Sequence, residues 1–497
     1  QTYRTGAYAL IPGLRRRKLH QKVASVLQRT AKDLDTEAPI LAYHYQQAGE
    51  DAYAFTWLVR AAQAAQARFA HEQALEYYQR AVSLNSGDLA PVYEQMGQIA
   101  HHLARYSDGV RCFEQALAEW QAQGNIPGQA RSHYALAECF RELSQYARSA
   151  AAAQAGLDLA LGQSEVPDQA RLAAHGHIIL SNALRSGQLG PPEEIRRHLH
   201  TAIELSLPLD DWQLCGEANF WLGVVAINNG DPLAALGYDH QALEYFQHSH
   251  APGWQAICHN NLAYHALLAG QPRLALETAQ AGLDQARQIG SLHSLGWLLS
   301  TLGEAHFHLG KDAEARRALE TALELVDQWG PPRLKPGLLV DLARLDMACQ
   351  NWHEAVSRLE KALSLAKQTA PQFIPRLRVH LAAALLGKRQ PAQAERQSVE
   401  AQRVARQKGQ HSVEGQAWRI LGLIHASQDD PEAAVRAFSQ SLQLLESVGD
   451  RLELARTRVA MGRLFKAQGD ERVAQVLVEQ ARRTFMEMEA VSDLDAL

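Results

Sequence analysis

The sequence predicts an all-α protein, an α-solenoid superhelix built from about eleven helical hairpins with a period of about 40 residues. Three observations support this prediction. Aromatic residues make up only 7% of the chain, alanine is abundant, and no alternating β-branched run occurs. Small residues return at a constant step along the chain. Residues that end one helix and start the next recur at the same position within each repeat.

Small residues form three phased series in the last seven units. The first series, in the first helix of each unit, is Gly223, Ala263, Gly303, Ala343, Ala382, Gly422 and Gly462, and each member follows a leucine or a methionine. The second series, in the second helix, is Ala235, Ala275, Ala315, Ala355, Ala394, Ala434 and Ala474. The third is Ala242, Gly282, Ala322, Ala362, Ala401, Ser441 and Ala481. Two antiparallel helices approach closely only where side chains are small, so these series predict stacked hairpins.

The pattern continues toward the N-terminus with less regularity. The corresponding positions are Ser181/Ile195/Ala202, Ala137/Ser149/Gly156, Gly97/Gly109/Ala116 and Ala62/Ala74/Ala81. One of these earlier units has two extra residues within the stretch Gly187–Pro192. Because insertions are tolerated best in connections, we expect them to lie in the turn between its two helices.

The connections between paired helices have a common chemistry. Asn229-Gly230-Asp231-Pro232 and Gln428-Asp429-Asp430-Pro431 stand at one phase of the repeat, as do 269–272 and 388–391. Each stretch combines a helix stop, a capping residue and a proline in the first turn of the next helix. Gly310-Lys311-Asp312 stands at the same position of the repeat but has no proline. These turns predict where each first helix ends and each second helix begins.

The residues Leu302-Gly303, Ala315, Leu319 and Ala322 resemble the signature of the tetratricopeptide repeat in a version of about 40 residues. The resemblance covers residues 55–494 and implies a solenoid whose concave face binds other molecules. It is specific for the fold and does not indicate what is bound.

Residues 1–54 are out of phase with the repeats. The segment contains, in order, the proline Pro12, the basic cluster Arg15–Lys18, the pair Leu19-His20 and the helix-like stretch Ala42–Gly49. This order resembles the junction in bacterial signal-transduction ATPases with numerous domains (STAND), where the end of a winged-helix or linker region joins a tetratricopeptide array. The resemblance implies an ATPase or effector domain N-terminal to this chain. Because the sequence begins at Gln1 without a methionine, we expect it to be a fragment.

Composition restricts the class of protein further. Hydrophobic residues make up 46% and charged residues 21% of the chain, which is enough for a folded core, and no apolar run approaches the length of a membrane span. The net charge of −5 argues against direct nucleic-acid binding, and we interpret the cluster Arg15–Lys18 as a solvated helix start. Five scattered cysteines without a C-x-x-C pair fit a reducing, cytoplasmic location. We expect no membrane association.

The sequence contains no pattern typical of catalysis or of cofactor binding. A phosphate-binding G-x-x-x-x-G-K-[ST] loop, an H-E-x-x-H pair and a G-x-S-x-G nucleophile turn are all absent. The pairs His175/His177 and His306/His308 are spaced two apart, which places their side chains on different faces of a helix. We therefore expect no enzymatic activity, no metal site and no cofactor.

The concave surface remains as the candidate binding site. In a solenoid of this kind we expect the first helices to line it, with exposed positions on either side of the small residue facing the groove. The candidates are Arg131, Tyr134, Glu138, Arg141, Asn182, Arg185, Asn260, Tyr264, Trp297, Glu304, Phe307, Arg344 and Arg419. Asparagine amides pair with a peptide main chain, and guanidinium groups pair with carboxylate or phosphate. The alternative for each residue is ordinary packing or hydration, and Tyr264 and Trp297 fit a core role as well.

Two functions follow from these features. The first is a non-enzymatic sensor array of a larger bacterial regulatory ATPase, which binds a protein, peptide or small-molecule effector in the groove and shifts the attached switch. The resemblance to STAND proteins implies this function, including a role in signal transduction or transcription regulation. The alternative is a free-standing scaffold that mediates protein–protein interactions.

Overall fold

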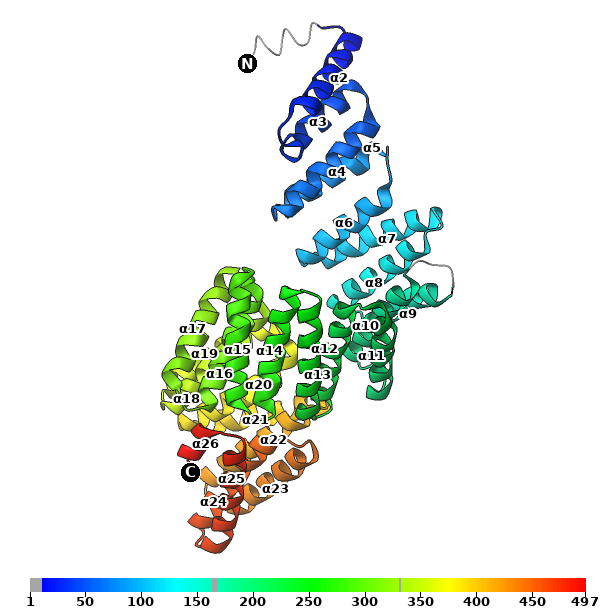
Figure 1. Cartoon of the computed structure of the whole chain (residues 1–497). Coiled ribbons are helices and arrows are strands. Elements are labelled where there is room, and N and C mark those ends of the chain that lie inside the picture. The colour runs from blue at the N-terminus through cyan, green and yellow to red at the C-terminus, as the bar shows by residue number, and fades with distance from the viewer. Residues whose placement is uncertain (1–10, 163–167, 330–331) are drawn as a thin grey trace. The chain divides into compact units, whose positions relative to one another are not determined.

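The computed structural model describes residues 11–162, 168–329 and 332–497 (Figure 1). Within these ranges every regular element is a helix, and the helices are arranged as repeated hairpins. The predicted all-α solenoid class is confirmed. The chain divides into two compact units, residues 1–214 and 215–497.

The helices of the first unit follow one another in antiparallel pairs. They are α2 (Gly13–Thr30), α3 (Leu34–Ala48), α4 (Asp51–Ala67), α5 (His71–Leu84), α6 (Leu89–His102), α7 (Tyr106–Ala122), α8 (Ile126–Glu142), α9 (Tyr146–Leu161), α10 (Gln169–Gly187) and α11 (Pro192–Ser206), followed by the short 3-10 helix η1 (Leu207–Leu209).

The second unit continues the same order. Helix α12 (Trp212–Asn228) runs across the division. The following helices are α13 (Pro232–His248), α14 (Pro252–Leu268), α15 (Pro272–Gln288), α16 (Leu292–His308), α17 (Asp312–Trp329), α18 (Lys335–Ala348), α19 (Trp352–Thr369), α20 (Ile374–Gly387), α21 (Pro391–Gln407), α22 (His411–Ser427), α23 (Pro431–Ser447), α24 (Arg451–Ala467), α25 (Glu471–Glu487) and α26 (Val491–Asp495). Two 3-10 turns, η2 (Pro332–Leu334) and η3 (Pro371–Phe373), precede α18 and α20.

The described helices from α4 to α25 form eleven pairs, as the repeat pattern predicted. The helices that touch most extensively are mainly the two members of one pair, or the second helix of one pair and the first of the next. The two extra residues of the α10–α11 pair lie between Gly187, which ends α10, and Pro192, which begins α11.

The small residues of the repeat occupy the contacts between paired helices. Ala275 and Ala315 are completely buried, as are their counterparts in most units. Where the small residue is glycine, a large side chain fills the space above it. A Cβ atom added to Gly422 would lie 2.5 Å from a ring carbon of Phe438, and one added to Gly303 would lie 2.6 Å from Leu319 Cγ. The spacing of small residues therefore sets how closely the helices approach.

The turns between paired helices also match their predicted chemistry. The Asp231 carboxylate accepts a hydrogen bond from the Ala234 amide at 3.0 Å, and the Asp430 carboxylate accepts one from the Ala433 amide at 3.0 Å. Gly230 has a positive φ of 78°, which glycine adopts without steric cost. Within a few residues the first helix thus ends, the chain reverses direction and the second helix begins.

Replacing Ala315 with leucine should lower the free energy of unfolding by about 1–3 kcal/mol, because the added atoms have no space between the paired helices. Glu314 provides the matched control, since its side chain is exposed on the same helix and Glu314→Leu should change stability by less than about 0.5 kcal/mol. Urea unfolding of both variants measures the difference. Equal unfolding midpoints would show that the buried and exposed positions of the repeat have been assigned incorrectly.

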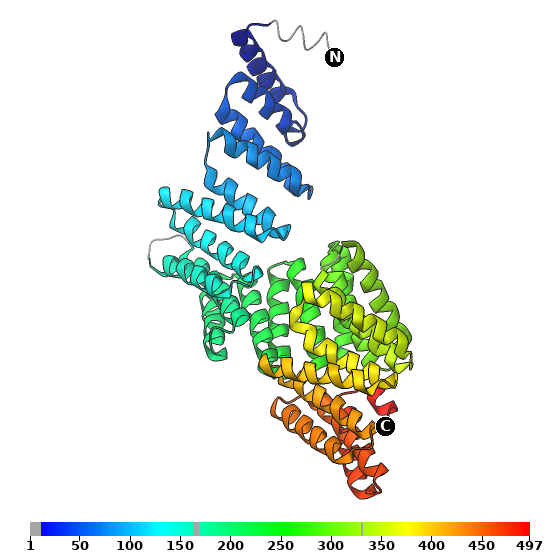
Figure 2. The same ribbon diagram turned by 180° about the vertical axis from the view of Figure 1, so that it is seen from behind.

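The second unit winds back on itself at its C-terminal end. Helix α26 contacts α16, and the Ser492 hydroxyl donates a hydrogen bond to the Phe307 carbonyl at 3.1 Å. The turns after α14 and α16 also meet this end, because Gly270 lies against Met488 and Gly310 lies against Val491. In Figure 1 the green helices α14–α16 face the viewer, whereas the yellow helices face the viewer in Figure 2. The helices of this unit therefore curve round until its last helix meets α16.

The boundary expected after residue 54 falls inside α4, which begins at Asp51. Ala24, Leu41 and Leu58, from α2, α3 and α4, belong to one hydrophobic core that continues to Ile99. The N-terminal helices thus pack as a further hairpin on the first repeat. Of the helices that the structure describes, none combines the length and the apolar character that a membrane span requires.

Candidate functional site

The first helices of the hairpins form the inner wall of the second unit. Consecutive first helices contact one another from α14 through α16, α18, α20 and α22 to α24, whereas second helices of consecutive units touch far less. Helices on the inside of a curve are closer together than those outside, so the first helices line the concave side, as expected. We use the name inner wall for these six helices.

Charged and polar side chains from the inner wall gather in one group, which we name the inner cluster. Its members are Tyr264, Glu304, His308, Asp341, Arg344, Arg376, His380, Arg419, Glu453 and Arg456, together with Asp493 of α26. The charges of residues from helices several repeats apart act on one another. Arg376 of α20, for example, faces Tyr264 of α14 and Glu453 of α24. These side chains therefore lie close to one another.

Ion pairs connect consecutive helices of the inner wall on one side of the cluster. Arg344 Nη1 lies 3.1 Å from Glu304 Oε1 on the preceding first helix and 3.3 Å from Asp341 Oδ1 on its own. The Arg344 guanidinium also lies 4.8 Å from the centre of the Phe307 ring. One arginine thus bridges two repeats and covers an aromatic ring.

A second set of ion pairs extends to the C-terminal helix. Arg419 Nη2 lies 2.6 Å from Glu453 Oε2, and Arg456 Nη1 lies 2.6 Å from Glu453 Oε1. Arg456 also donates through Nε and Nη2 to the two oxygens of Asp493, both at 2.8 Å. This is a bidentate geometry, which is the stronger arrangement for such pairs. Asp493 therefore holds α26 against the inner wall.

Burial and neighbouring charges shift the pKa values of these groups. Burial alone raises the pKa of Glu453, but the positive charges of Arg419 and Arg456 outweigh burial and hold that pKa well below its usual range. Burial, followed by the negative charge of Glu304, raises the pKa of Asp341 to about 6. Burial, followed by the positive charge of Arg344, lowers the pKa of His308 to about 4. His308 is therefore neutral at pH 7.

Replacing His308 with asparagine should make the protein less sensitive to mild acid. The unfolded histidine titrates near 6.5 and the folded one near 4, so between these values the unfolded state binds more protons and stability falls as the pH falls. Between pH 7 and pH 5 this group should cost the wild type about 1–2 kcal/mol. Urea unfolding at both pH values measures the effect. From pH 7 to pH 5 the free energy of unfolding of His308→Asn should fall by that much less than the free energy of unfolding of the wild type. The exposed His353→Asn variant is the control, and the same loss in both variants would contradict the buried neutral state of His308.

The first unit has a smaller polar cluster on its first helices α8 and α10. Glu138, Arg141 and Asn182 line a small cavity whose remaining wall is Ala137, Ser149 and Ile179. Burial raises the pKa of Glu138 and lowers that of His175, which faces it. Arg141 contacts Glu142 at 2.5 Å. These candidates are brought together, but the space between them is too small for more than a water molecule.

Tyr134 does not face the groove, contrary to the sequence-based prediction. Its side chain is only 2% exposed, and its hydroxyl donates to the Leu172 carbonyl at 3.1 Å. Added Cβ atoms at Gly156 and Gly176 would both overlap its ring or hydroxyl. The small residues at these positions admit the tyrosine into the core, which is why exposure predicted from phase alone was wrong.

The remaining candidates lie in several environments. Arg131 is exposed and lies 3.8 Å from Glu94, whereas Arg185 is largely buried and burial lowers its pKa to about 10. Asn260 accepts a hydrogen bond from Thr301 at 3.0 Å. Trp297 packs partly against the core, and the Arg333 guanidinium lies 5.9 Å from its ring. These contacts give Asn260 and Trp297 structural roles, in line with the packing alternative.

Several members of the inner cluster were not predicted from the sequence. Arg376 lies six residues before the small residue Ala382, just beyond the window of positions used for the groove. Asp341 and His380 each lie two residues before a small residue, inside that window, and are adjacent to apolar residues in a first helix. A window one residue wider would have included Arg376 as a position, whereas Asp341 and His380 were already within it and were passed over.

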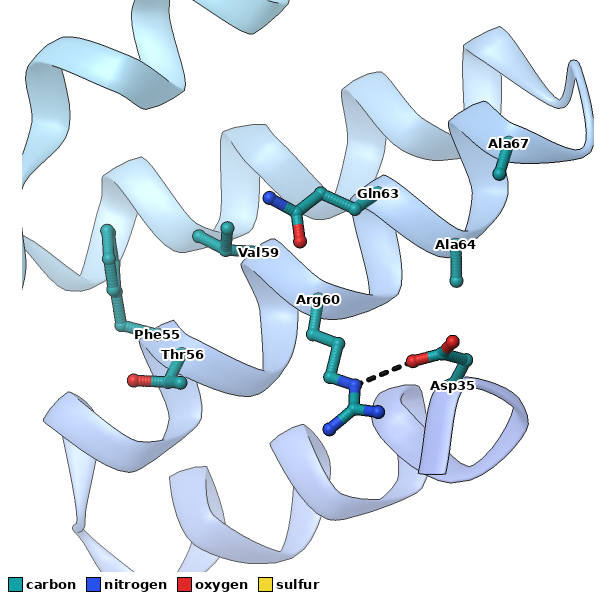
Figure 3. Close-up of a pocket in the computed structure, with 8 residues that line it drawn as sticks. All are labelled: Asp35, Phe55, Thr56, Val59, Arg60, Gln63, Ala64 and Ala67. Carbon is teal, nitrogen blue, oxygen red and sulfur yellow. Dashed lines mark hydrogen bonds and ion pairs between the residues drawn. The ribbon is translucent and has the colours of Figure 1, made fainter. Parts of the chain in front are cut away.

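A second cavity, also absent from the prediction, lies on α4 in the first unit (Figure 3). Its volume is about 540 Å³, and it is lined by Asp35, Phe55, Thr56, Val59, Arg60, Gln63, Ala64 and Ala67. Arg60 Nε lies 2.6 Å from Asp35 Oδ1 at one side of it. All lining residues except Asp35 come from one helix, so this is a shallow groove along α4.

The cysteines of the described residues are free thiols. Cys258 is completely buried, its Sγ donates to the Asp239 carbonyl at 3.3 Å, and burial raises its pKa. His265 Nδ1 lies 2.5 Å from Asp239 Oδ2 in the same buried region. A buried neutral thiol is a weak nucleophile, so this Cys–His–Asp proximity is a packing feature. The described part of the chain has no group of three or more potential metal-ligating side chains.

Comparison with known proteins adds a family and a fold. Residues 413–487 match the family model described as tetratricopeptide repeat. No curated protein matches the sequence. The matched segment covers α23, α24 and α25 and most of α22, so this part of the second unit matches tetratricopeptide repeats.

Solved structures show where the same fold occurs. A Rap protein complexed with competence and sporulation factor is 12% identical, with a TM-score of 0.58, covering 73% of this chain and 99% of that one. The Rap conjugation gene regulator of plasmid pLS20 in complex with the Phr* peptide is 13% identical, with a TM-score of 0.51, covering 75% and 97%. A STAND protein with a tetratricopeptide repeat sensor from Pyrococcus horikoshii is 14% identical, with a TM-score of 0.40, covering 70% and 54%. At these identities the Rap proteins share the tetratricopeptide-type helical solenoid fold with this chain.

Proposed function

We propose that this chain is a non-enzymatic sensor array whose second unit binds a peptide, protein or small-molecule effector on its inner wall. The observation that carries this proposal is the inner cluster, in which the first helices of six hairpins bring polar and charged side chains close together. Charged groups gathered inside a helical protein are costly unless they have a role, and ligand binding is the role that fits a concave wall. The Rap structures, which contain a peptide or a sporulation factor, support a binding role for this fold.

We further propose that the array belongs to a larger STAND-type regulatory ATPase in the bacterial cytoplasm. The resemblance of residues 1–54 to the junction of such proteins supports this, and an ATPase or effector domain would then precede Gln1. The coding sequence upstream of this segment tests the idea directly. A phosphate-binding loop within one domain length is expected, and its absence would favour the free-standing scaffold.

Selection of a peptide-display library on the whole chain tests the binding function. Tyr264 is 38% exposed within the inner cluster, so Tyr264→Ala removes a contact surface without opening the core. Tyr53→Ala, at an exposed tyrosine of the first unit, is the matched control. Selected peptides should bind Tyr264→Ala at least about tenfold more weakly and Tyr53→Ala within about twofold. Peptides that lose affinity only for the control, or no selected peptide at all, would contradict the proposed site.

A further inference from the structure

One guanidinium of the inner cluster has no ion pair. Arg344, Arg419 and Arg456 each have a carboxylate oxygen within 3.1 Å. Arg376 has none within 4 Å among the residues that the structure describes. It faces Glu304 at longer range, and that carboxylate is already bound by Arg344.

Two nitrogen atoms near Arg376 lack hydrogen-bond partners. His380 Nε2 and Arg419 Nε are both buried, and neither has a partner in the described part of the protein. His380 lies one helical turn after Arg376 on α20, and positions four apart share a helix face. Arg376 and Arg419 both act on the charge of His380. An arginine that has no carboxylate partner therefore lies close to two nitrogen atoms that have no hydrogen-bond partner.

These groups are rich in donors and poor in acceptors. A guanidinium can only donate hydrogen bonds, and the neutral imidazole has one donating nitrogen. Burial, followed by the positive charges of Arg376 and Arg344, lowers the pKa of His380 well below its usual value, so His380 is neutral. Buried donors without acceptors cost free energy, and an acceptor bound among them would recover it.

The carboxylates of the inner cluster do not supply this acceptor. Glu304 and Asp341 are both engaged by Arg344, and Glu453 is held by Arg419 and Arg456. Moving any of them to Arg376 would break a pair that already exists. An acceptor from outside the chain would leave all of these pairs intact.

Solvent reaches this part of the inner wall. Tyr264 is 38% exposed, although its hydroxyl faces Arg376 and the charges of Glu304 and Asp341 act on it. Solvent therefore reaches the Tyr264 side chain beside Arg376. A small group can therefore approach Arg376 from the centre of the unit.

We infer that Arg376, with His380 and Arg419 beside it, binds the carboxylate group of the effector. This inference rests on the proposed binding function and gives the chemical class that the inner wall recognises. The planar guanidinium of Arg376 matches a carboxylate in bidentate geometry, and the neighbouring nitrogens complete its hydrogen bonds. The carboxylate is supplied by the C-terminus of a peptide or by a small organic acid.

Calorimetric titration of the whole chain at constant ionic strength tests the inference. The probes are glutarate and N-acetyl-trialanine with a free carboxylate, each compared with its neutral amide, and inorganic phosphate. The wild type should bind at least one free carboxylate and neither amide. Arg376→Gln should weaken that binding at least about tenfold, and Arg376→Lys should retain part of it, because lysine keeps the charge but not the planar fork.

Arg403→Gln is the matched control, since Arg403 is exposed on the second helix α21 and pairs with Glu400. It should bind like the wild type, and circular dichroism shows whether each variant is folded. Stronger binding of glutarate or of the peptide identifies the source of the carboxylate. The inference would be overturned if acids and amides bound equally, or if neither Arg376→Gln nor Arg376→Lys changed binding. It would also be overturned if only phosphate bound, or if nothing bound. Library peptides that depend on Tyr264 but not on Arg376 would leave the proposed function standing and remove only the carboxylate site.

Discussion

Phe438→Ala is expected to lower the free energy of unfolding by about 3–5 kcal/mol. Phe438 of α23 is completely buried, and its ring lies over Gly422 of α22. The alanine would leave a cavity between two paired helices that the surrounding backbone cannot close. Chemical denaturation followed by circular dichroism measures the change.

A substitution at the partner position tests the same contact from the other side. A Cβ atom at Gly422 would lie 2.5 Å from the Phe438 ring, so Gly422→Leu should also destabilise strongly. In the double variant Gly422→Leu/Phe438→Ala the leucine occupies space that the ring has left. The double variant should therefore lose at least about 1 kcal/mol less than the sum of the two single variants.

Gly237→Ala is the control for this cycle. No atom lies within 4 Å of a Cβ at Gly237, which is exposed on α13. An alanine there should raise stability by about 0.5–1 kcal/mol, because glycine is a poor helix former. Additive losses in the cycle, or a loss at Gly237 as large as at Gly422, would contradict the packing between first and second helices.

Arg456→Met is expected to lower the free energy of unfolding of the second unit by about 3–5 kcal/mol. Arg456 contacts Glu453 at 2.6 Å and Asp493 at 2.8 Å. Methionine would fill a similar volume but would leave the Asp493 carboxylate, only 16% exposed, without its positive partner. The loss arises from that uncompensated charge.

A surface ion pair on the same helix provides the comparison. Arg451 pairs with Glu487, both side chains are more than half exposed, and Arg451→Met should cost less than about 1 kcal/mol. Hydrogen exchange gives a second readout, because Arg456→Met should expose the amides of α26 while those of α20 remain protected. Protection of α26 in both variants would show that Asp493 does not hold this helix.

The order of helices was predictable because small residues leave a strong pattern. Gly303 and Ala315 repeat at about 40 residues since each marks a close contact that every hairpin must make. The turn residues add an independent signal, and Asp231 and Asp430 cap the helices that they were expected to cap. Local chemistry of this kind is fully present in the sequence.

The site was only partly predictable, because phase indicates a helix face and not its surroundings. Glu304, Arg344 and Arg419 were identified by phase and lie in the inner cluster. Tyr134 has the same phase but is buried, since two glycines open space for it. The importance of Arg376 depends on which carboxylates other arginines have already bound, and that depends on helices several repeats away. Nothing near Arg376 in the sequence contains this information.

The contact between α26 and α16 has a consequence for how the second unit folds. An ordinary repeat array is held by neighbours alone, so it can unravel from either end one repeat at a time. Here the Ser492–Phe307 hydrogen bond joins residues 185 positions apart. Such a distant connection forms late and slows folding, since most of the intervening chain must be ordered first. Once formed, it should make the second unit melt as a single cooperative block.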